Sequence, residues 1–74
     1  MARKIKVGIV GCGTIGGELA AACAGRLRDS MELIGICDQD AKRAESLNAL
    51  LKDKARVLKL DELVKKSDLI VEAA

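Results

Sequence analysis

Three closely spaced glycines are the residues of this sequence whose types and spacing point most directly to chemistry. Residues 11–16 read Gly-Cys-Gly-Thr-Ile-Gly, the pattern G-x-G-x-x-G, directly after an apolar run and at the start of a helical pattern. In that setting Gly11 permits a tight turn, Gly13 lets a pyrophosphate approach the backbone, and Gly16 lets the helix lie close to a sheet. The amides of the first helical turn then point at the phosphates. The loop therefore predicts a dinucleotide-binding site.

An acidic residue completes this pattern at the end of the second apolar run. Asp38, with Gln39 beside it, follows the last glycine by about 20 residues, the spacing at which a carboxylate accepts the hydroxyls of the adenosine ribose. Such a carboxylate repels a 2′-phosphate, so the sequence favours NAD over NADP. Arg43, and to a lesser degree Lys42, could soften that repulsion, which leaves NADP open as a second cofactor.

The elements that must position the loop and the acid follow from the hydrophobic pattern. We expect strands at residues 5–10, 31–37, 56–58 and 68–71. Helices should separate them, beginning near Thr14 and behind Asp40 and Asp61 as N-caps. Strands that alternate with helices form parallel βαβ units, and right-handed crossovers give the strand order 3-2-1-4. The sequence thus predicts an α/β fold, a partial Rossmann fold of about four parallel strands with helices mainly on one face.

The helical segments also predict which side chains face the sheet. For the first helix the apolar stripe consists of Ile15, Leu19, Ala22, Cys23 and Leu27. Arg26 and Arg28 should lie in its last turn, where cations suit the helix dipole. In the second helix the inward residues are Ala44, Leu47 and Leu51, and the outward residues are Lys42, Arg43, Glu45 and Lys52.

Composition excludes several classes of function. The 74 residues are 50% apolar but contain no aromatic residue, and the net charge of +2 comes from interleaved basic and acidic residues. There is therefore neither a basic stripe nor a stacking residue for nucleic acid. No apolar stretch approaches the ~20 residues that span a bilayer. We expect no nucleic-acid partner and no membrane association.

The cysteines predict a reduced, cytoplasmic protein. Cys12, Cys23 and Cys37 form no CxxC pair, and the chain has no histidine, so no metal site is expected. Cys12 lies near a helix start, where a thiolate could be favoured, but packing is the simpler role.

Two other families with glycine loops fit this sequence less well. A P-loop requires Gly-Lys at the end of its motif, where residues 17–18 of this sequence are Gly-Glu. A methyltransferase that uses S-adenosylmethionine usually has an acid just before its loop, and Ile9 and Val10 stand there.

With these residues placed, the chain resembles the N-terminal part of the L-aspartate dehydrogenase family. The resembling stretches are KVGIVGCGTIGGELA, ELIGICDQDAKRAESL and RVLKLDELVKKSDLIVEAA, which cover most of the chain. The tail at residues 71–74 is shared with homoserine dehydrogenases. The resemblance implies that the parent protein oxidises a small amino acid, L-aspartate, to iminoaspartate with NAD(P). A regulatory nucleotide-sensing module, as in potassium-uptake regulators, and another dehydrogenase such as homoserine dehydrogenase remain the alternatives.

The resemblance also implies which residues act. The cofactor-binding residues would be Gly11, Cys12, Gly13, Thr14, Ile15, Gly16, Asp38, Gln39, Ala73 and Ala74, the last two beside the nicotinamide. The family's substrate domain and catalytic histidine lie downstream, so residues 1–74 would be the N-terminal part of a dinucleotide-binding domain without a catalytic residue. Such a chain should bind cofactor weakly and transfer no hydride. It should form a homo-oligomer through the sheet face that the first two helices leave uncovered.

Overall fold

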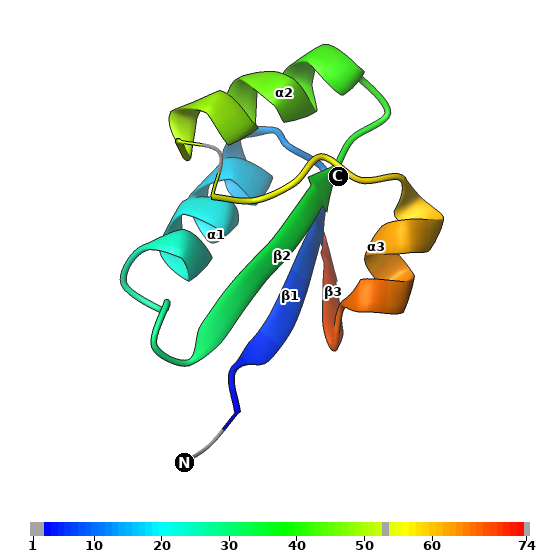
Figure 1. Ribbon diagram of the computed structural model, residues 1–74. Helices are drawn as coiled ribbons and strands as arrows, with labels where there is room; N and C mark the ends of the chain where they lie inside the picture. The colour runs from blue at the N-terminus through cyan, green and yellow to red at the C-terminus, as the bar shows by residue number, and fades with distance from the viewer. Residues whose placement is uncertain (1–2, 53, 74) are drawn as a thin grey trace.

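The computed structural model describes residues 3–52 and 54–73, which form three strands and three helices (Figure 1). In chain order these are β1 (Ile5–Val10), α1 (Thr14–Ala24), β2 (Met31–Cys37), α2 (Ala41–Leu50), α3 (Leu60–Lys66) and β3 (Leu69–Glu72). All three strands are parallel and lie in the order β2-β1-β3. The predicted partial Rossmann fold is confirmed, and it brings the carboxyl ends of the strands to one end of the sheet.

The segment at residues 56–58 lies where the predicted order requires, but it is not a strand. It meets β2 at a single parallel bridge between Ile36 and Val57. The Ile36 amide donates to the Arg56 carbonyl at 2.8 Å, and the Leu58 amide donates to the Ile36 carbonyl at 3.0 Å. One residue on β2 makes both bonds, so no ladder propagates. The prediction of four strands is corrected to three within the described residues.

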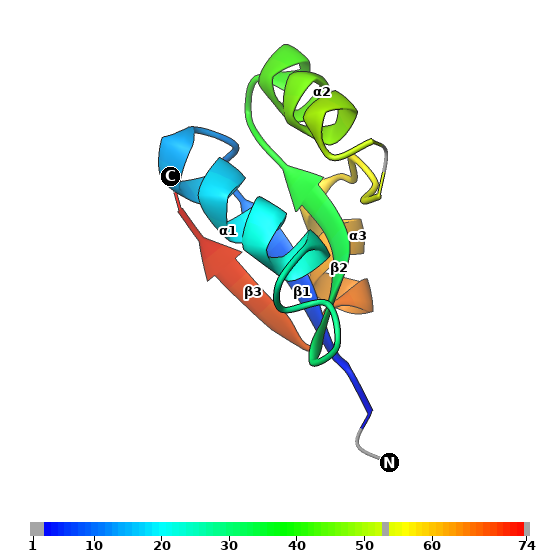
Figure 2. The ribbon, with the colours of Figure 1, turned by 90° about the vertical axis from the view of Figure 1, so that its left-hand side faces the viewer.

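The hydrophobic core lies between the sheet and the helices α1 and α2. Its main side chains are Val7, Ile9, Leu33 and Ile36 of the strands, Ala20 and Cys23 of α1, and Ala44, Leu47 and Leu51 in and after α2. Figure 2 shows α1 in front of the sheet and α2 beyond the carboxyl end of β2, with α3 behind. The predicted inward face of the second helix is therefore confirmed.

The predicted stripe of α1 is wrong in its large members. The buried residues of α1 are Gly16, Ala20 and Cys23, whereas Ile15 is 66% exposed and Leu19 is 37% exposed. A Cβ on Gly16 would overlap the carbonyl of Gly11. Because the helix lies this close to the end of β1, only small residues fit on its inner face and the larger ones lie at its flank.

The face of the sheet opposite α1 carries two glycines at its centre and is covered there by α3. A Cβ on Gly8 would lie 2.7 Å from the Leu63 side chain, and one on Gly35 would lie 2.9 Å from Leu58 and 3.0 Å from Leu63. The glycines therefore let α3 approach closely, and Leu63 is fully buried. The expected uncovered apolar face is not present in this form, because the short helix and two glycines close its centre.

The helices begin and end only in part where the sequence predicts. The Asp40 carboxylate accepts the Lys42 amide at 3.0 Å and caps α2, as predicted. The N-cap of α3 is Lys59 rather than Asp61, which lies in the first turn. α1 ends at Ala24, before Arg26, because Gly25 ends the helix and turns follow it. Among the described residues, no helix has the length and apolar character needed to cross a membrane.

Candidate functional site

A cleft of about 560 Å³ lies at the carboxyl end of the sheet. Its lining consists of Val10, Gly11, Gly13, Asp38, Gln39, Arg43, Leu60, Glu72 and Ala73. Five residues predicted from the sequence are among them, although they come from three different segments of the chain. Parallel strands bring these segments together, because the loops that follow β1, β2 and β3 meet at one end.

The glycine loop has the geometry that its sequence predicts. Gly11 has φ of 98°, a conformation that favours glycine, and its amide donates to the Cys37 carbonyl at 2.8 Å. At Gly13 an added Cβ would meet only the Arg43 guanidinium, at 4.0 Å, among the described residues. The backbone at Gly13 is thus open to a ligand, and the turn at Gly11 directs the chain into α1.

The N-terminus of α1 is free to receive an anion. Its N-cap is Gly13, and in the described part of the chain no side chain bonds to its first-turn amides as a cap. The first helical bond runs from the Gly17 amide to the Gly13 carbonyl at 2.8 Å. By contrast, the N-terminus of α2 is capped by Asp40. The amides and the positive end of the α1 dipole therefore fit a phosphate group.

Asp38 joins the second strand to the glycine loop. One carboxylate oxygen accepts the Cys12 amide at 2.7 Å, and the other accepts the Asp40 amide at 2.8 Å. The bond from Cys12, followed by that from Asp40 and the nearby charge of Arg43, lowers the pKa of Asp38 below its ordinary value. The half-buried carboxylate is therefore ionised at neutral pH and lines the cleft as a hydrogen-bond acceptor.

Cys12 is a packed thiol in this structure. It is buried, and its thiol donates to the Cys37 carbonyl at 3.6 Å. Burial raises the pKa of Cys12, and the Asp38 carboxylate raises it further. The thiolate that a helix start could favour is thus disfavoured here. Cys12 and Thr14 line a neighbouring hollow between α1 and α2 rather than the cleft itself, whereas Gly13 and Arg43 line both.

The remaining predicted residues lie around the cleft or outside the described chain. Ile15 is mostly exposed, Gly16 is buried beneath the loop, and Ala74 lies outside the described residues. The lining also contains Leu60 and Glu72, which were not predicted as site residues. Glu72 directly precedes Ala73 at the carboxyl end of β3. Its position after the apolar residues of that strand could have identified it as a residue of the cleft. No sequence pattern could have identified Leu60 as a residue of the cleft, because only the path of the chain into α3 places it there.

Residues 11–74 match the sequence family described as the NAD-binding domain of homoserine dehydrogenase. The chain belongs to this family. The family is one of NAD-binding domains, and the exposed loop amides and the ionised carboxylate described above suit that cofactor. The match agrees with the predicted dehydrogenase rather than with the regulatory alternative.

Individual relatives agree with the family. The chain is 44% identical over 71 residues to L-aspartate dehydrogenase of Methanosarcina acetivorans, covering 95% of this chain and 26% of that protein. It is 47% identical over 70 residues to L-aspartate dehydrogenase of Methanocella arvoryzae, covering 93% of this chain and 25% of that protein. The chain thus spans about a quarter of the length of these relatives.

Solved structures share the fold. UDP-N-acetylglucosamine 3-dehydrogenase GnnA from Acidithiobacillus ferrooxidans superposes with a TM-score of 0.81 at 24% identity, covering 99% of this chain and 23% of that one. GenD2 from gentamicin A biosynthesis, in complex with NAD, superposes with a TM-score of 0.77 at 26% identity, covering 100% of this chain and 21% of that one. Their similarity supports the assignment of the parallel α/β fold.

Proposed function

We propose that this chain is the N-terminal, cofactor-binding part of an L-aspartate dehydrogenase. The observation that carries the proposal is the cleft in which the open backbone of Gly13, the uncapped N-terminus of α1 and the Asp38 carboxylate lie together. When bound, NAD supplies a nicotinamide ring that accepts a hydride from the amino acid. The names of the similar proteins from Methanosarcina acetivorans and Methanocella arvoryzae support aspartate as the substrate.

The residues of the cleft have distinct roles in this proposal. The loop at residues 11–16 holds the pyrophosphate through backbone amides, and Asp38 with Gln39 accepts the ribose hydroxyls. Ala73 and Ala74 border the nicotinamide. Arg43 is the residue that would permit NADP, because its guanidinium lies close to the loop and its charge offsets that of Asp38.

Residues 1–74 by themselves bind cofactor weakly and transfer no hydride in this proposal. A dinucleotide extends across two mononucleotide-binding halves, and the three described strands are fewer than the six strands that two such halves contain. The chain contains no histidine to act as the acid or base, so the substrate domain supplies catalysis. We propose the cytoplasm as its location, since all three cysteines are free thiols.

Self-association is a further part of the proposal. The exposed apolar surface on the α1 side of the sheet contains Ile15 and Leu19 of α1 and Leu69 of β3, which is 45% exposed. Leu69 pairs with Val7, whose side chain belongs to the core on that side. These residues, rather than the glycine-lined face under α3, are the surface through which two copies would associate.

A chimera tests the proposed function directly. Residues 1–74 would replace the quarter of the Methanosarcina acetivorans enzyme that this chain matches. We expect the chimera to reduce NAD with L-aspartate, because the residues that hold the cofactor are supplied by this chain. The readout is the absorbance of the reduced nicotinamide, together with NAD affinity measured by calorimetry.

Two controls make the result decisive. The 74-residue chain alone should give no aspartate-dependent signal, and the chimera with Asp38→Ala should require much more NAD. A folded chimera that binds NAD but does not oxidise aspartate would contradict the assignment of the substrate. A folded chimera that does not bind NAD would contradict the assignment of the site.

A further inference from the structure

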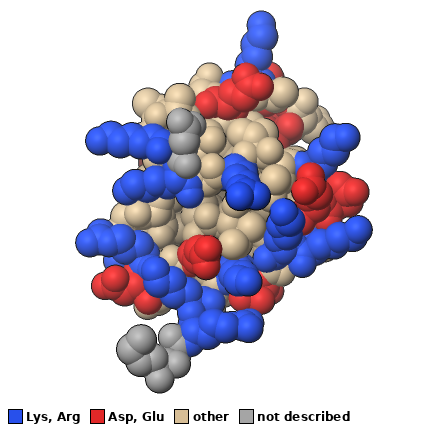
Figure 3. Space-filling view, in the orientation of Figure 1, with Lys and Arg blue, Asp and Glu red and all other residues tan. Residues whose placement is uncertain are grey.

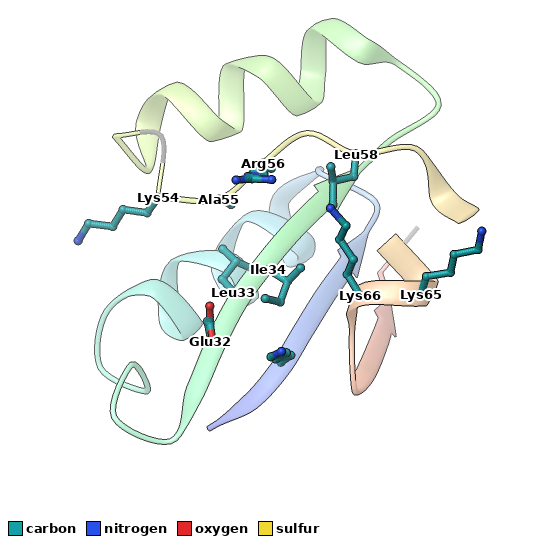
Figure 4. Close-up of a pocket in the computed structure, with 10 residues that line it drawn as sticks. Glu32, Leu33, Ile34, Lys54, Ala55, Arg56, Leu58, Lys65 and Lys66 are labelled. Carbon is teal, nitrogen blue, oxygen red and sulfur yellow. The ribbon is translucent and has the colours of Figure 1, made fainter. Parts of the chain in front are cut away.

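A basic hollow of about 510 Å³ lies away from both the cofactor cleft and the hollow between α1 and α2. It is bounded by the first half of β2, the segment at residues 54–58 and the end of α3 (Figure 4). The residues that line it are Lys6, Glu32, Leu33, Ile34, Lys54, Ala55, Arg56, Leu58, Lys65 and Lys66. It shares no lining residue with the cofactor cleft, so a ligand here would not occupy the dinucleotide site.

Positive charge is concentrated around this hollow. Its lining carries five cationic side chains and one acidic side chain, a net charge of +4, whereas the whole chain has a net charge of +2. The rest of the chain is therefore slightly acidic. Figure 3 shows Lys and Arg side chains spread around this face, with uncharged surface and several Asp and Glu side chains between them. A concave surface with one sign of charge focuses the potential and attracts ions of the opposite sign.

Most of these cations have no ion-pair partner among the residues that the structure describes. Lys66 forms an ion pair with Glu62 at 3.8 Å. In the described part of the chain, Lys6, Lys54, Arg56 and Lys65 form no ion pair. The nearby acid Asp68 is already engaged, since it pairs with Arg3 at 3.4 Å and accepts the Lys6 amide at 3.0 Å. The charge of the hollow is thus left for an external anion to balance.

The arrangement of the side chains limits the size of that anion. In Figure 4 Arg56 and Lys66 extend over the middle of the hollow, and Lys54 and Lys65 stand at its two sides. Leu33, Ile34 and Leu58 line it without adding charge. Its volume falls within the range of small-ligand sites, and ammonium and guanidinium groups suit phosphate oxygens. We propose that this hollow binds a small anion with several negative charges, of the polyphosphate kind.

Amide NMR of the chain, titrated with sodium tripolyphosphate at low salt, tests the proposal and separates the two anion-binding regions. We expect shifts at the amides of Ile34, Arg56 and Lys66 that saturate and that weaken with added salt. Binding at the N-terminus of α1 would shift Gly13 and Thr14 instead. Shifts confined to that loop, or non-saturating shifts over the whole surface, would overturn the proposal.

Charge-matched variants provide the control. Arg56→Gln with Lys66→Gln should weaken tripolyphosphate binding at the hollow about ten-fold, as expected for two lost ion contacts. Arg26→Gln with Lys42→Gln removes the same charge outside the hollow and should leave that affinity nearly unchanged. Equal weakening in both variants would overturn the proposal.

A gain of affinity can be tested as well. Glu32 is the acidic residue of the lining and is exposed, so Glu32→Gln should preserve the fold and strengthen binding about two- to three-fold. Loss of folding cannot imitate an increase in affinity. An unchanged or weakened affinity in this variant would contradict a site governed by the charge of the hollow.

Discussion

At the scale of single residues, the Asp38 carboxylate is engaged by the protein itself. Its oxygens accept the amides of Cys12 and Asp40, so it fixes the glycine loop against the end of β2. Each carboxylate oxygen has two lone pairs, and one on each oxygen remains for a ribose hydroxyl. The same side chain therefore orders the loop and, in the proposed function, presents an acceptor to the cofactor.

Replacing Asp38 with alanine should separate the two cofactors. We expect NAD binding to weaken about ten- to a hundred-fold, because charge-assisted hydrogen bonds to the ribose are lost. NADP should weaken less or bind better, since the repulsion of its 2′-phosphate disappears and Arg43 remains. Calorimetric titration with both cofactors measures the difference, with Asp29→Ala as an exposed control. Equal losses for the two cofactors would indicate that Asp38 acts only on the loop.

Acid should destabilise the fold partly through the same residue. The folded pKa of Asp38 is lowered, chiefly by the Cys12 amide, relative to an ordinary aspartate pKa of about 3.9. Its contribution to stability is therefore complete well above that value and is lost as the pH falls through the lower, folded pKa. In urea unfolding at a series of pH values, the free energy of unfolding of Asp38→Asn should fall less steeply at acid pH than that of the unaltered chain. The same fall in both proteins would exclude this linkage.

At the scale of elements, the two adjacent glycines of α1 differ in whether the structure has room for a side chain. A Cβ on Gly16 would overlap the Gly11 carbonyl, whereas one on Gly17 would make ordinary contact with Leu47 at 3.6 Å. Gly16→Ala should therefore destabilise the fold by about 1–3 kcal/mol through overpacking. Gly17→Ala should stabilise it by about 0.5–1 kcal/mol, because alanine favours the helix. Urea midpoints compare the two, and similar effects from both substitutions would be inconsistent with this packing.

The attachment of α3 depends on one buried side chain. Leu63 is fully buried against Gly8 and Gly35, while its neighbour Val64 is 53% exposed. Leu63→Ala should cost about 2–5 kcal/mol, the range for a large buried residue. Val64→Ala should change stability little. Chemical unfolding of both variants measures the contrast, and a small effect at Leu63 would show that α3 is not held by this contact.

At the scale of the whole molecule, exposed apolar residues occur on several elements, and Ile15 and Leu19 of α1 with Leu69 of β3 lie on the same side of the sheet. We expect the chain to self-associate at micromolar concentration, with Leu19→Lys shifting it toward monomer. Leu50→Lys is the control, because Leu50 is 82% exposed on α2. Sedimentation velocity measures the species present. A well-folded monomer of the unaltered chain, or equal effects from both variants, would refute association through this surface.

The sequence by itself determined the elements and the chemistry that depends on local backbone. The positive φ of Gly11, the cap at Asp40 and the alternation of strands with helices follow from residue types and their spacing. These features depend on conformations that a short segment adopts alone or that a periodic pattern requires. For the same reason the loop and Asp38 could be identified as parts of one site before their contact was known.

Tertiary structure decided which side chains those elements bury and which join the site. Periodicity placed Ile15 and Leu19 inward, but the approach of α1 to Gly11 admits only small residues there. Likewise, the bonds of Ile36 leave residues 56–58 as a bridge instead of a strand, and Leu60 reaches the cleft only through the crossover to α3. Distances between segments far apart in sequence set these outcomes, and no local pattern encodes such distances.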